Sequence, residues 1–247
     1  MIFKSLSKKA VTEHNNKPEV IVQTPSIKDR IKNIIDLGFT PQCIFDCGAS
    51  VGYWSYEASK LFPGAQIVAI EPNSLVIPKA EEILGKIKPP VIIEQCALGA
   101  TEGKAYLNIF WNEDHTKMSA SSLKDHVQGA PEKKLEVRLD TLDNICEKYG
   151  VVPDFLKLDL QGGELEALKG AERVLESAEV ILTEFGCLEA YVNRTTPYDL
   201  FELMYKNDYC LYDIIDLLYR PYDNALTGGD FIFVKNDSPL KKYKGYK

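Results

Sequence analysis

The sequence predicts an α/β fold in which a mostly parallel sheet carries helices on both faces. Short apolar runs alternate with helical patterns, as in parallel strands joined by right-handed crossovers. One of these runs ends at Asp46 in a glycine turn that opens a helix. The last two runs, 209–214 and 230–235, are separated by a turn-rich segment, and we expect them to form an antiparallel end of the sheet.

Length and composition fit one domain. The chain has 247 residues, of which 45% are hydrophobic and 26% charged, enough for one substantial core. Residues 1–24 are polar and lysine-rich without periodicity, so we expect an N-terminal arm there. The domain is then expected over residues 25–240, followed by a basic tail over 241–247.

The first half of the domain predicts helices and strands in alternation. In order, these are a helix from residue 27, a strand at 43–46, a helix over 54–61, a strand at 66–71, a helix over 73–86 and a strand at 91–96. Gly38 stands where the first helix should end, since glycine is favoured just after the last helical turn. Pro78 is expected to interrupt or bend its helix, because proline lacks the N–H that a helix interior needs.

The second half begins with a different pattern. Residues 103–111 and 135–139 alternate like strands, and the polar stretch 112–134 between them carries a serine cluster at 119–122. Loops of that length inside a compact domain are typically functional or disordered, so this stretch is a candidate substrate lid. Alternation then resumes with a helix at 141–149, a strand at 154–160, a helix at 164–176, a strand at 179–185 and a helix at 197–206.

Charge and cysteine usage restrict the partners and the compartment. The net charge of −7 and the pI near 5.2 argue against a nucleic-acid surface, which usually leaves a basic footprint. The six cysteines form no C-x-x-C pair and lie mostly in apolar runs, as reduced thiols do. No apolar signal segment and no run of membrane-spanning length is present. We therefore expect a cytoplasmic protein with a small polar substrate, and a homodimer is left open.

The glycine turn reads D-x-G-x-x-x-G from Asp46 to Gly52. At such a turn backbone N–H groups approach a bound cofactor, and Gly48 and Gly52 admit positive φ and close contact. The middle glycine of the dinucleotide motif G-x-G-x-x-G is missing, which favours S-adenosylmethionine over NAD. The alternative is a strand-to-helix turn that binds nothing.

Four of the five predicted parallel strands end in a carboxylate, and ligands of such sheets bind beyond those ends. Glu71 follows the turn at about the interval at which an acidic residue meets ribose hydroxyls. Asp46 is expected to hold the turn or the amino-acid end of the cofactor, or to cap the next helix. Asp159 stands with Lys157 in an apolar strand, where charges are costly unless paired or functional. It is the best candidate for handling the substrate's proton, and a structural pair with Lys157 is the alternative.

Together these segments resemble the FkbM-type family of S-adenosylmethionine-dependent methyltransferases. The matching segments are IFDCGASVGYWS, VAIEPN, EQCALGATEG, LDTLDNI, FLKLDLQGGELEALKGAERVL and the C-terminal LYDI, RPYDNAL and GGDFIFV, over about residues 30–237. The resemblance implies a Rossmann-like class I methyltransferase fold with a seven-stranded sheet, and methylation of hydroxyl groups, often on sugars of surface polysaccharides or on natural products. Cofactor contacts are expected at Asp46, Gly48, Ala49, Gly52, Glu71, Pro72, Asn73, the backbone around Ala97, and Asp159 at the edge of the methyl-transfer cleft.

A sugar hydroxyl is a poor nucleophile while protonated, so we expect a general base among Asp159, Glu184 and His115. Asp159, Glu184 and Asp230 could converge on a divalent cation, but we expect no required metal, and zinc motifs are absent from the sequence. Two other hypotheses compete with an O-methyltransferase that acts on a small-molecule or glycan hydroxyl. One is an NAD-dependent oxidoreductase, and the other is a cofactor-binding module without turnover.

Overall fold

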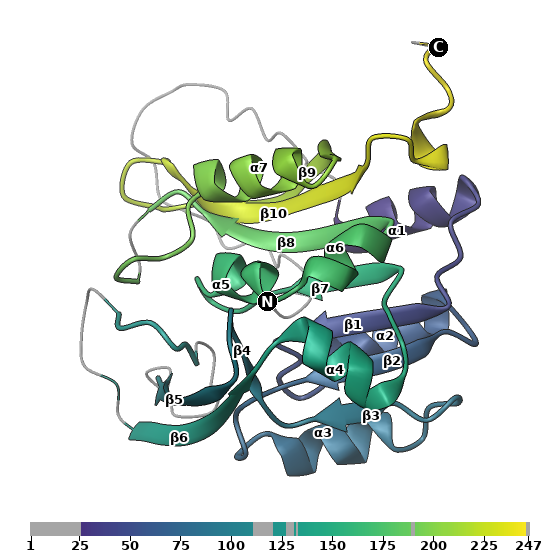
Figure 1. The fold of residues 1–247 in the computed structure, drawn as a ribbon. Helices are drawn as coiled ribbons and strands as arrows, with labels where there is room; N and C mark the ends of the chain where they lie inside the picture. The colour runs from purple at the N-terminus through teal and green to yellow at the C-terminus, as the bar shows by residue number, and fades with distance from the viewer. Residues whose placement is uncertain (1–25, 111–120, 127–130, 132, 189–190, 246–247) are drawn as a thin grey trace, which may run out of the picture.

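A computed structural model describes residues 26–110, 121–126, 131, 133–188 and 191–245. Its centre is a seven-stranded sheet with the strand order β3-β2-β1-β7-β8-β10-β9 (Figure 1). The strands are β1 (Cys43–Cys47), β2 (Gln66–Ile70), β3 (Ile92–Glu94), β7 (Phe155–Leu158), β8 (Val180–Gly186), β9 (Tyr209–Tyr219) and β10 (Leu226–Lys235). The first five in the spatial order pair in parallel, and β10 is antiparallel to both of its neighbours. This is the expected mostly parallel sheet of the Rossmann-like methyltransferase class.

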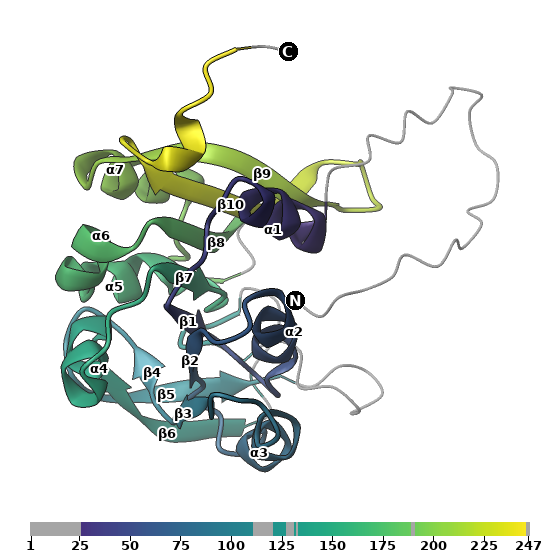
Figure 2. The ribbon, with the colours of Figure 1, turned by 90° about the vertical axis from the view of Figure 1, so that its right-hand side faces the viewer.

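Helices cover both faces of the sheet, as predicted (Figure 2). One face carries α1 (Ile27–Asp36), α2 (Tyr53–Leu61) and α3 (Ile77–Leu84). The other carries α4 (Leu142–Tyr149), α5 (Glu164–Lys169), α6 (Glu172–Ser177) and α7 (Pro197–Lys206), and a short 3₁₀ turn, η1 (Pro239–Lys241), follows the last strand. Two large apolar clusters fill the layers between sheet and helices. Within the described ranges, no helix has the length and apolar character needed to cross a bilayer.

A second, three-stranded sheet stands beside the main one. It consists of β4 (Ala97–Leu98), β6 (Lys133–Asp140) and β5 (Gly103–Ile109), in that spatial order. The predicted strand at 91–96 is therefore wrong in extent, because the chain leaves the main sheet after Glu94 and enters the second sheet at Ala97. The alternating segments 103–111 and 135–139 do pair, antiparallel, as β5 and β6.

Two predicted helices differ from the structure. The helix over 73–86 begins only at Ile77, so Pro78 stands in its first turn, where the missing N–H has no intrahelical partner to lose. The helix over 164–176 is divided into α5 and α6 at Gly170. A Cβ at Gly170 would lie 2.4 Å from the carbonyl oxygen of Gly99, so the break lets the chain approach the second sheet closely.

The two C-terminal strands form the antiparallel end of the sheet, as predicted, and both are longer than predicted. Of the turn-rich segment 220–229, residues 226–229 belong to β10, and the connection between the two strands is residues 220–225. β10 lies between β8 and β9, so the last strand of the chain is inserted in the sheet instead of forming its edge. A Cβ at Gly228 would lie 2.4 Å from the carbonyl oxygen of Phe185, which accounts for glycine at this crossing. The insertion brings Asp230 beside Glu184.

Candidate active site

A row of ionisable side chains crosses one face of the main sheet at the carboxyl ends of its parallel strands. On this face the strands contribute Ile44, Phe155, Leu182 and Ile232 to the core under α1 and α2. Side chains alternate between the faces of a strand, so the residues two positions nearer this edge point the same way. They are Asp46 on β1, Lys157 and then Asp159 on and after β7, Glu184 on β8, and Asp230 on β10.

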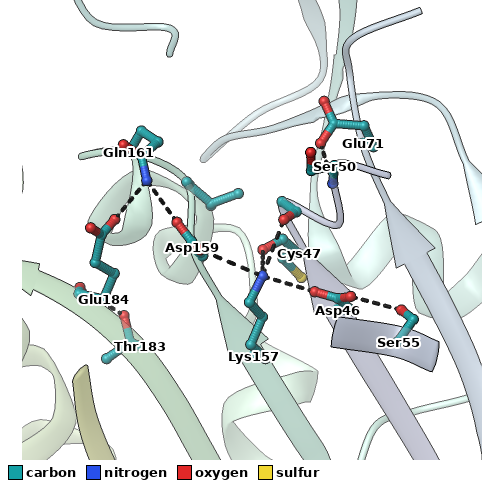
Figure 3. Close-up of polar contacts among 12 residues, drawn as sticks. Asp46, Cys47, Ser50, Ser55, Glu71, Lys157, Asp159, Gln161, Thr183 and Glu184 are labelled. Atoms are coloured by element: carbon teal, nitrogen blue, oxygen red, sulfur yellow. Dashed lines mark hydrogen bonds and ion pairs between the residues drawn. The ribbon is translucent and has the colours of Figure 1, made fainter. Parts of the chain in front are cut away.

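Lys157 lies at the centre of this row and is buried. Its Nζ is 2.9 Å from Oδ1 of Asp46 and 3.9 Å from Oδ2 of Asp159, and it donates to the carbonyl oxygen of Gly48 at 3.1 Å (Figure 3). Burial alone would lower the pKa of Lys157, but the carboxylates of Asp46 and Asp159 outweigh it and raise that pKa above its ordinary value. The lysine is therefore a fixed cation beneath the glycine turn, and its nearest partner is Asp46 instead of the Asp159 considered from the sequence.

Asp46 is completely buried and its carboxylate is used inside the protein. Besides Lys157, it accepts a hydrogen bond of 2.7 Å from the hydroxyl of Ser55 in α2. Of the roles expected for this residue, holding the turn fits these contacts best. Asp46 links β1, β7 and the first turn of α2, and thereby fixes how the chain passes from the glycine turn into that helix.

The two glycines of the turn are required by packing as well as by backbone conformation. Gly48 has a φ of +79°, and a Cβ there would lie 1.9 Å from the carbonyl oxygen of Asp159. Gly52 has a φ of +85°, and its Cβ would lie 2.7 Å from the side chain of Leu84 in α3. The N–H groups of Gly48 and Ala49 both donate to the carbonyl oxygen of Ile70, at 2.9 and 3.1 Å. The turn is thus pressed against the neighbouring strand ends.

Glu71 lies at the end of β2, facing this turn, and is almost fully buried. One carboxylate oxygen accepts the N–H of Ser50 and the other the N–H of Asn73, each at 2.8 Å. Burial raises the pKa of Glu71 to about 7, although both backbone N–H groups oppose that rise. Each oxygen still has acceptor capacity, so the carboxylate fits a pair of ribose hydroxyls. Pro72 follows it, and the amide of Asn73 reaches the hydroxyl of Ser121 at 3.3 Å.

Asp159 and Glu184 are joined by one amide group. Nε2 of Gln161 donates to Oδ1 of Asp159 at 2.8 Å and to Oε2 of Glu184 at 3.1 Å (Figure 3). The hydroxyl of Tyr191 donates to Oε1 of the same glutamine at 3.0 Å. Asp159 and Glu184, both named from the sequence, are therefore brought together at the ends of β7 and β8.

The two carboxyl groups differ in acidity. Burial acts to raise the pKa of Asp159, but nearby positive charge, chiefly the ammonium of Lys157, and the amide of Gln161 hold it below its usual range. The pKa of Glu184 lies well above its usual value, because burial and the charges of Asp159, Glu164 and Asp230 all disfavour ionisation. Burial and Asp159 likewise raise the pKa of Asp230 to about 7. Of the two carboxyl groups, Glu184 therefore has the greater tendency to take up a proton.

Sequence reasoning missed the two residues that connect these carboxylates. Gln161 has a left-handed backbone, with a φ of +54°, and this conformation leaves no signal in the sequence. Tyr191 lies 30 residues further along and reaches the site only through the fold. A polar side chain two residues after a catalytic candidate was the one available indication.

Other predicted site residues are placed elsewhere or lie outside the described residues. Ala97 is buried in β4 of the second sheet and pairs with Leu139. His115, the arm over 1–24 and most of the candidate lid fall in undescribed ranges; within that lid, Ser122 bridges to Asn108 on β5. Among the described residues, no group of three His, Cys, Asp or Glu side chains is arranged to hold a metal ion, so the convergence of Asp159, Glu184 and Asp230 on a cation gains no support.

Comparison with known proteins gives a family match. The model of the family described as Methyltransferase FkbM domain matches residues 46–211. A protein named Methyltransferase sdnD, from Sordaria araneosa, is 26% identical over 170 residues, a match that covers 58% of this chain and 65% of that protein. The chain thus spans just under two thirds of that relative's length.

Solved structures of low identity also align. Magnesium protoporphyrin IX methyltransferase from Synechocystis, solved with bound SAM, is 12% identical with a TM-score of 0.48, covering 84% of this chain and 77% of that one. Precorrin-6y C5,15-methyltransferase from Geobacter metallireducens is 14% identical with a TM-score of 0.46, covering 84% and 88%.

Proposed function

This chain belongs to the FkbM methyltransferase domain family, and from that premise we propose that it is an S-adenosylmethionine-dependent O-methyltransferase. The proposed acceptor is a hydroxyl group of a sugar, a polysaccharide precursor or a related small molecule. The observation that carries the proposal is the pair of carboxyl groups at the ends of β7 and β8, Asp159 and Glu184, which one amide group of Gln161 joins at 2.8 and 3.1 Å. Their surroundings move their pKa values in opposite directions.

The cleft beyond β2, β1 and β7 suits this cofactor. When bound, S-adenosylmethionine supplies an electrophilic methyl group on a positively charged sulfur. Glu71 would accept the two ribose hydroxyls while the glycine turn lies against the nucleoside. Asp159 follows β7 and Glu184 lies on β8, the next two strands after β1 in the sheet, and neighbouring strands are about 5 Å apart. Carboxyl groups at these positions would favour a cation bound beside them. The donor set therefore fits the cofactor's charge and its hydroxyl groups.

Glu184 is the proposed proton acceptor, in preference to Asp159. A carboxylate held ionised by Lys157 has little tendency to take a proton, whereas Glu184 gains stability when protonated. The bound cofactor would supply the methyl group to the acceptor hydroxyl, and Glu184 would take up the proton of that hydroxyl. In-line placement of the hydroxyl supplies much of the acceleration, and Asp159 and Gln161 would contribute to it.

The test is transfer of labelled methyl groups to a panel of neutral monosaccharides, oligosaccharides and glycosides. Glu184→Gln should still bind the neutral product S-adenosylhomocysteine as the wild type does, should bind the cationic S-adenosylmethionine more weakly, and should lose about 100-fold or more in kcat. Glu202→Gln, on the exposed side of α7, is the matched control and should stay active. Full activity of Glu184→Gln would overturn the assignment of the base. Cofactor binding without turnover across the panel would favour the binding-module hypothesis, and binding of NAD alone would favour the oxidoreductase.

A further inference from the structure

Gln161 is held in an uncommon backbone conformation by contacts on several sides. Its φ of +54° is sparsely populated for residues other than glycine, and such conformations persist where the surroundings fix them. The hydroxyl of Ser122 donates to its carbonyl oxygen at 2.8 Å, which ties the segment before β6 to this turn. These contacts fix the backbone of Gln161, and its side chain therefore extends from a fixed position toward Asp159 and Glu184.

Tyr191 determines which way the Gln161 amide faces. Its hydroxyl donates to Oε1, so the NH₂ group points toward the two carboxyl groups. The reversed amide would place Oε1 against carboxylate oxygens, which repel it. Tyr191 is itself buried, and its ring packs edge-on against that of His126 at 5.3 Å. Burial raises the pKa of Tyr191 to about 12, so the phenol remains a donor at neutral pH.

The two amide hydrogens require Oδ1 of Asp159 and Oε2 of Glu184 to be acceptors. The second oxygen of Glu184, Oε1, is then the atom left to receive a proton. We propose that Gln161, oriented by Tyr191, is a positioning residue that holds Glu184 with Oε1 toward the acceptor hydroxyl and stabilises its ionised form. This inference rests on the proposed function and adds to it two residues that act through Glu184.

The charged surroundings make this neutral donor significant. Glu184 is faced by Asp159 after β7, Asp230 on β10 and Glu164 on α5. Lys157 interacts with Asp159 at 3.9 Å, and Arg194, which influences Tyr191, donates to the carbonyl oxygen of Leu188. A hydrogen bond donated to a carboxylate favours ionisation, so losing the Gln161 amide should raise the pKa of Glu184 further.

The experiment is a double-mutant cycle on Tyr191→Phe and Gln161→Leu, read by ¹³C NMR titration of labelled glutamate carboxyls in the ligand-free protein. Glu184→Gln assigns the Glu184 signal. We expect Gln161→Leu to raise the midpoint of Glu184 by about one pH unit, and Tyr191→Phe to raise it by a smaller amount. Tyr191→Phe should add nothing in the Gln161→Leu background. Tyr205→Phe, on an exposed side chain of α7, is the control and should leave the midpoint unchanged.

An unchanged midpoint in Tyr191→Phe, or a full Tyr191→Phe effect in the Gln161→Leu background, would overturn the proposal. If Gln161→Leu does not fold, Tyr191→Phe alone decides, because it removes one oxygen and keeps the ring. The titration needs no acceptor, so it is separate from the test of methyl transfer. A shifted Glu184 midpoint in a protein that transfers no methyl group would support the positioning role and count against the proposed enzyme activity. Methyl transfer with an unshifted midpoint would support the enzyme activity and overturn the positioning role.

Discussion

Glu184 on β8 and Asp230 on β10 are direct register partners across an antiparallel pair, so their side chains share one face at the edge of the cleft. Opposed residues in such pairs have Cβ atoms about 5 Å apart, and two ionised carboxylates at that distance repel each other. Asp159 adds a third carboxyl group nearby. Each negative charge therefore disfavours ionisation of the others, and the pKa values of Glu184 and Asp230 lie above their usual values.

Asp230→Asn should make Glu184 easier to ionise. Removing a neighbouring negative charge lowers the pKa of Glu184, so the rise of kcat with pH should move to lower pH. The shift is measured from pH–rate profiles of the wild type and the variant. Asp237→Asn, on an exposed residue after β10, is the control for a general loss of charge. An unshifted profile would mean that Asp230 and Glu184 do not interact.

Binding of the cofactor should release protons, and binding of the product should release fewer. S-adenosylmethionine carries a positive sulfur that favours ionised Glu184 and Asp230, whereas S-adenosylhomocysteine is a neutral thioether. Calorimetric titrations in buffers of different ionisation enthalpy at pH 7 give the number of protons exchanged. Equal proton release for the two ligands would contradict the placement of these carboxyl groups beside the sulfur.

Glu71→Gln should weaken binding of both sulfur nucleosides by about tenfold or more, since one hydrogen bond to a charged group is worth roughly 1.5–3 kcal/mol. In the wild type we expect the ionised carboxylate to accept both ribose hydroxyls. Because its pKa is raised to about 7, affinity should fall as the pH is lowered below 7. For the neutral S-adenosylhomocysteine, which we expect to affect Glu184 and Asp230 less, most of this dependence should be lost in the variant. A pH-independent affinity in the wild type would show that Glu71 does not bind the ribose.

Gly48→Ala should destabilise the fold severely. The new Cβ would lie 1.9 Å from a backbone oxygen at a φ of +79°, so we expect a loss of about 3 kcal/mol or more in the free energy of unfolding. Gly64→Ala tests the conformational cost alone: its φ is +97° and no atom lies within 4 Å, so about 1–2 kcal/mol is expected. Urea unfolding measures both. Similar losses would mean that the contact with β7 is unimportant.

Those parts of the candidate site that depend on the local sequence pattern could be predicted from the sequence. The positions of Glu71, Asp159 and Glu184 at strand ends follow from apolar runs that stop at a carboxylate, and the structure places them along one edge. The partner of Lys157 was not predictable, because Asp46 lies 111 residues away and reaches it through the parallel pairing of β1 and β7.

The order of the strands in the sheet could not be predicted from the sequence either, because it depends on contacts between residues far apart in the chain. A hairpin pattern does not say which of its two strands enters the sheet, yet the insertion of β10 between β8 and β9 decides that Asp230 meets Glu184. The left-handed turn at Gln161 likewise depends on Ser122 and Tyr191, which approach it from distant parts of the chain.

The most direct test of the central claim is calorimetric titration of the wild-type protein with S-adenosylmethionine and S-adenosylhomocysteine, with NAD as the comparison. The account predicts that both sulfur nucleosides bind and that NAD does not. Binding of NAD alone, or of none of the three, would contradict it.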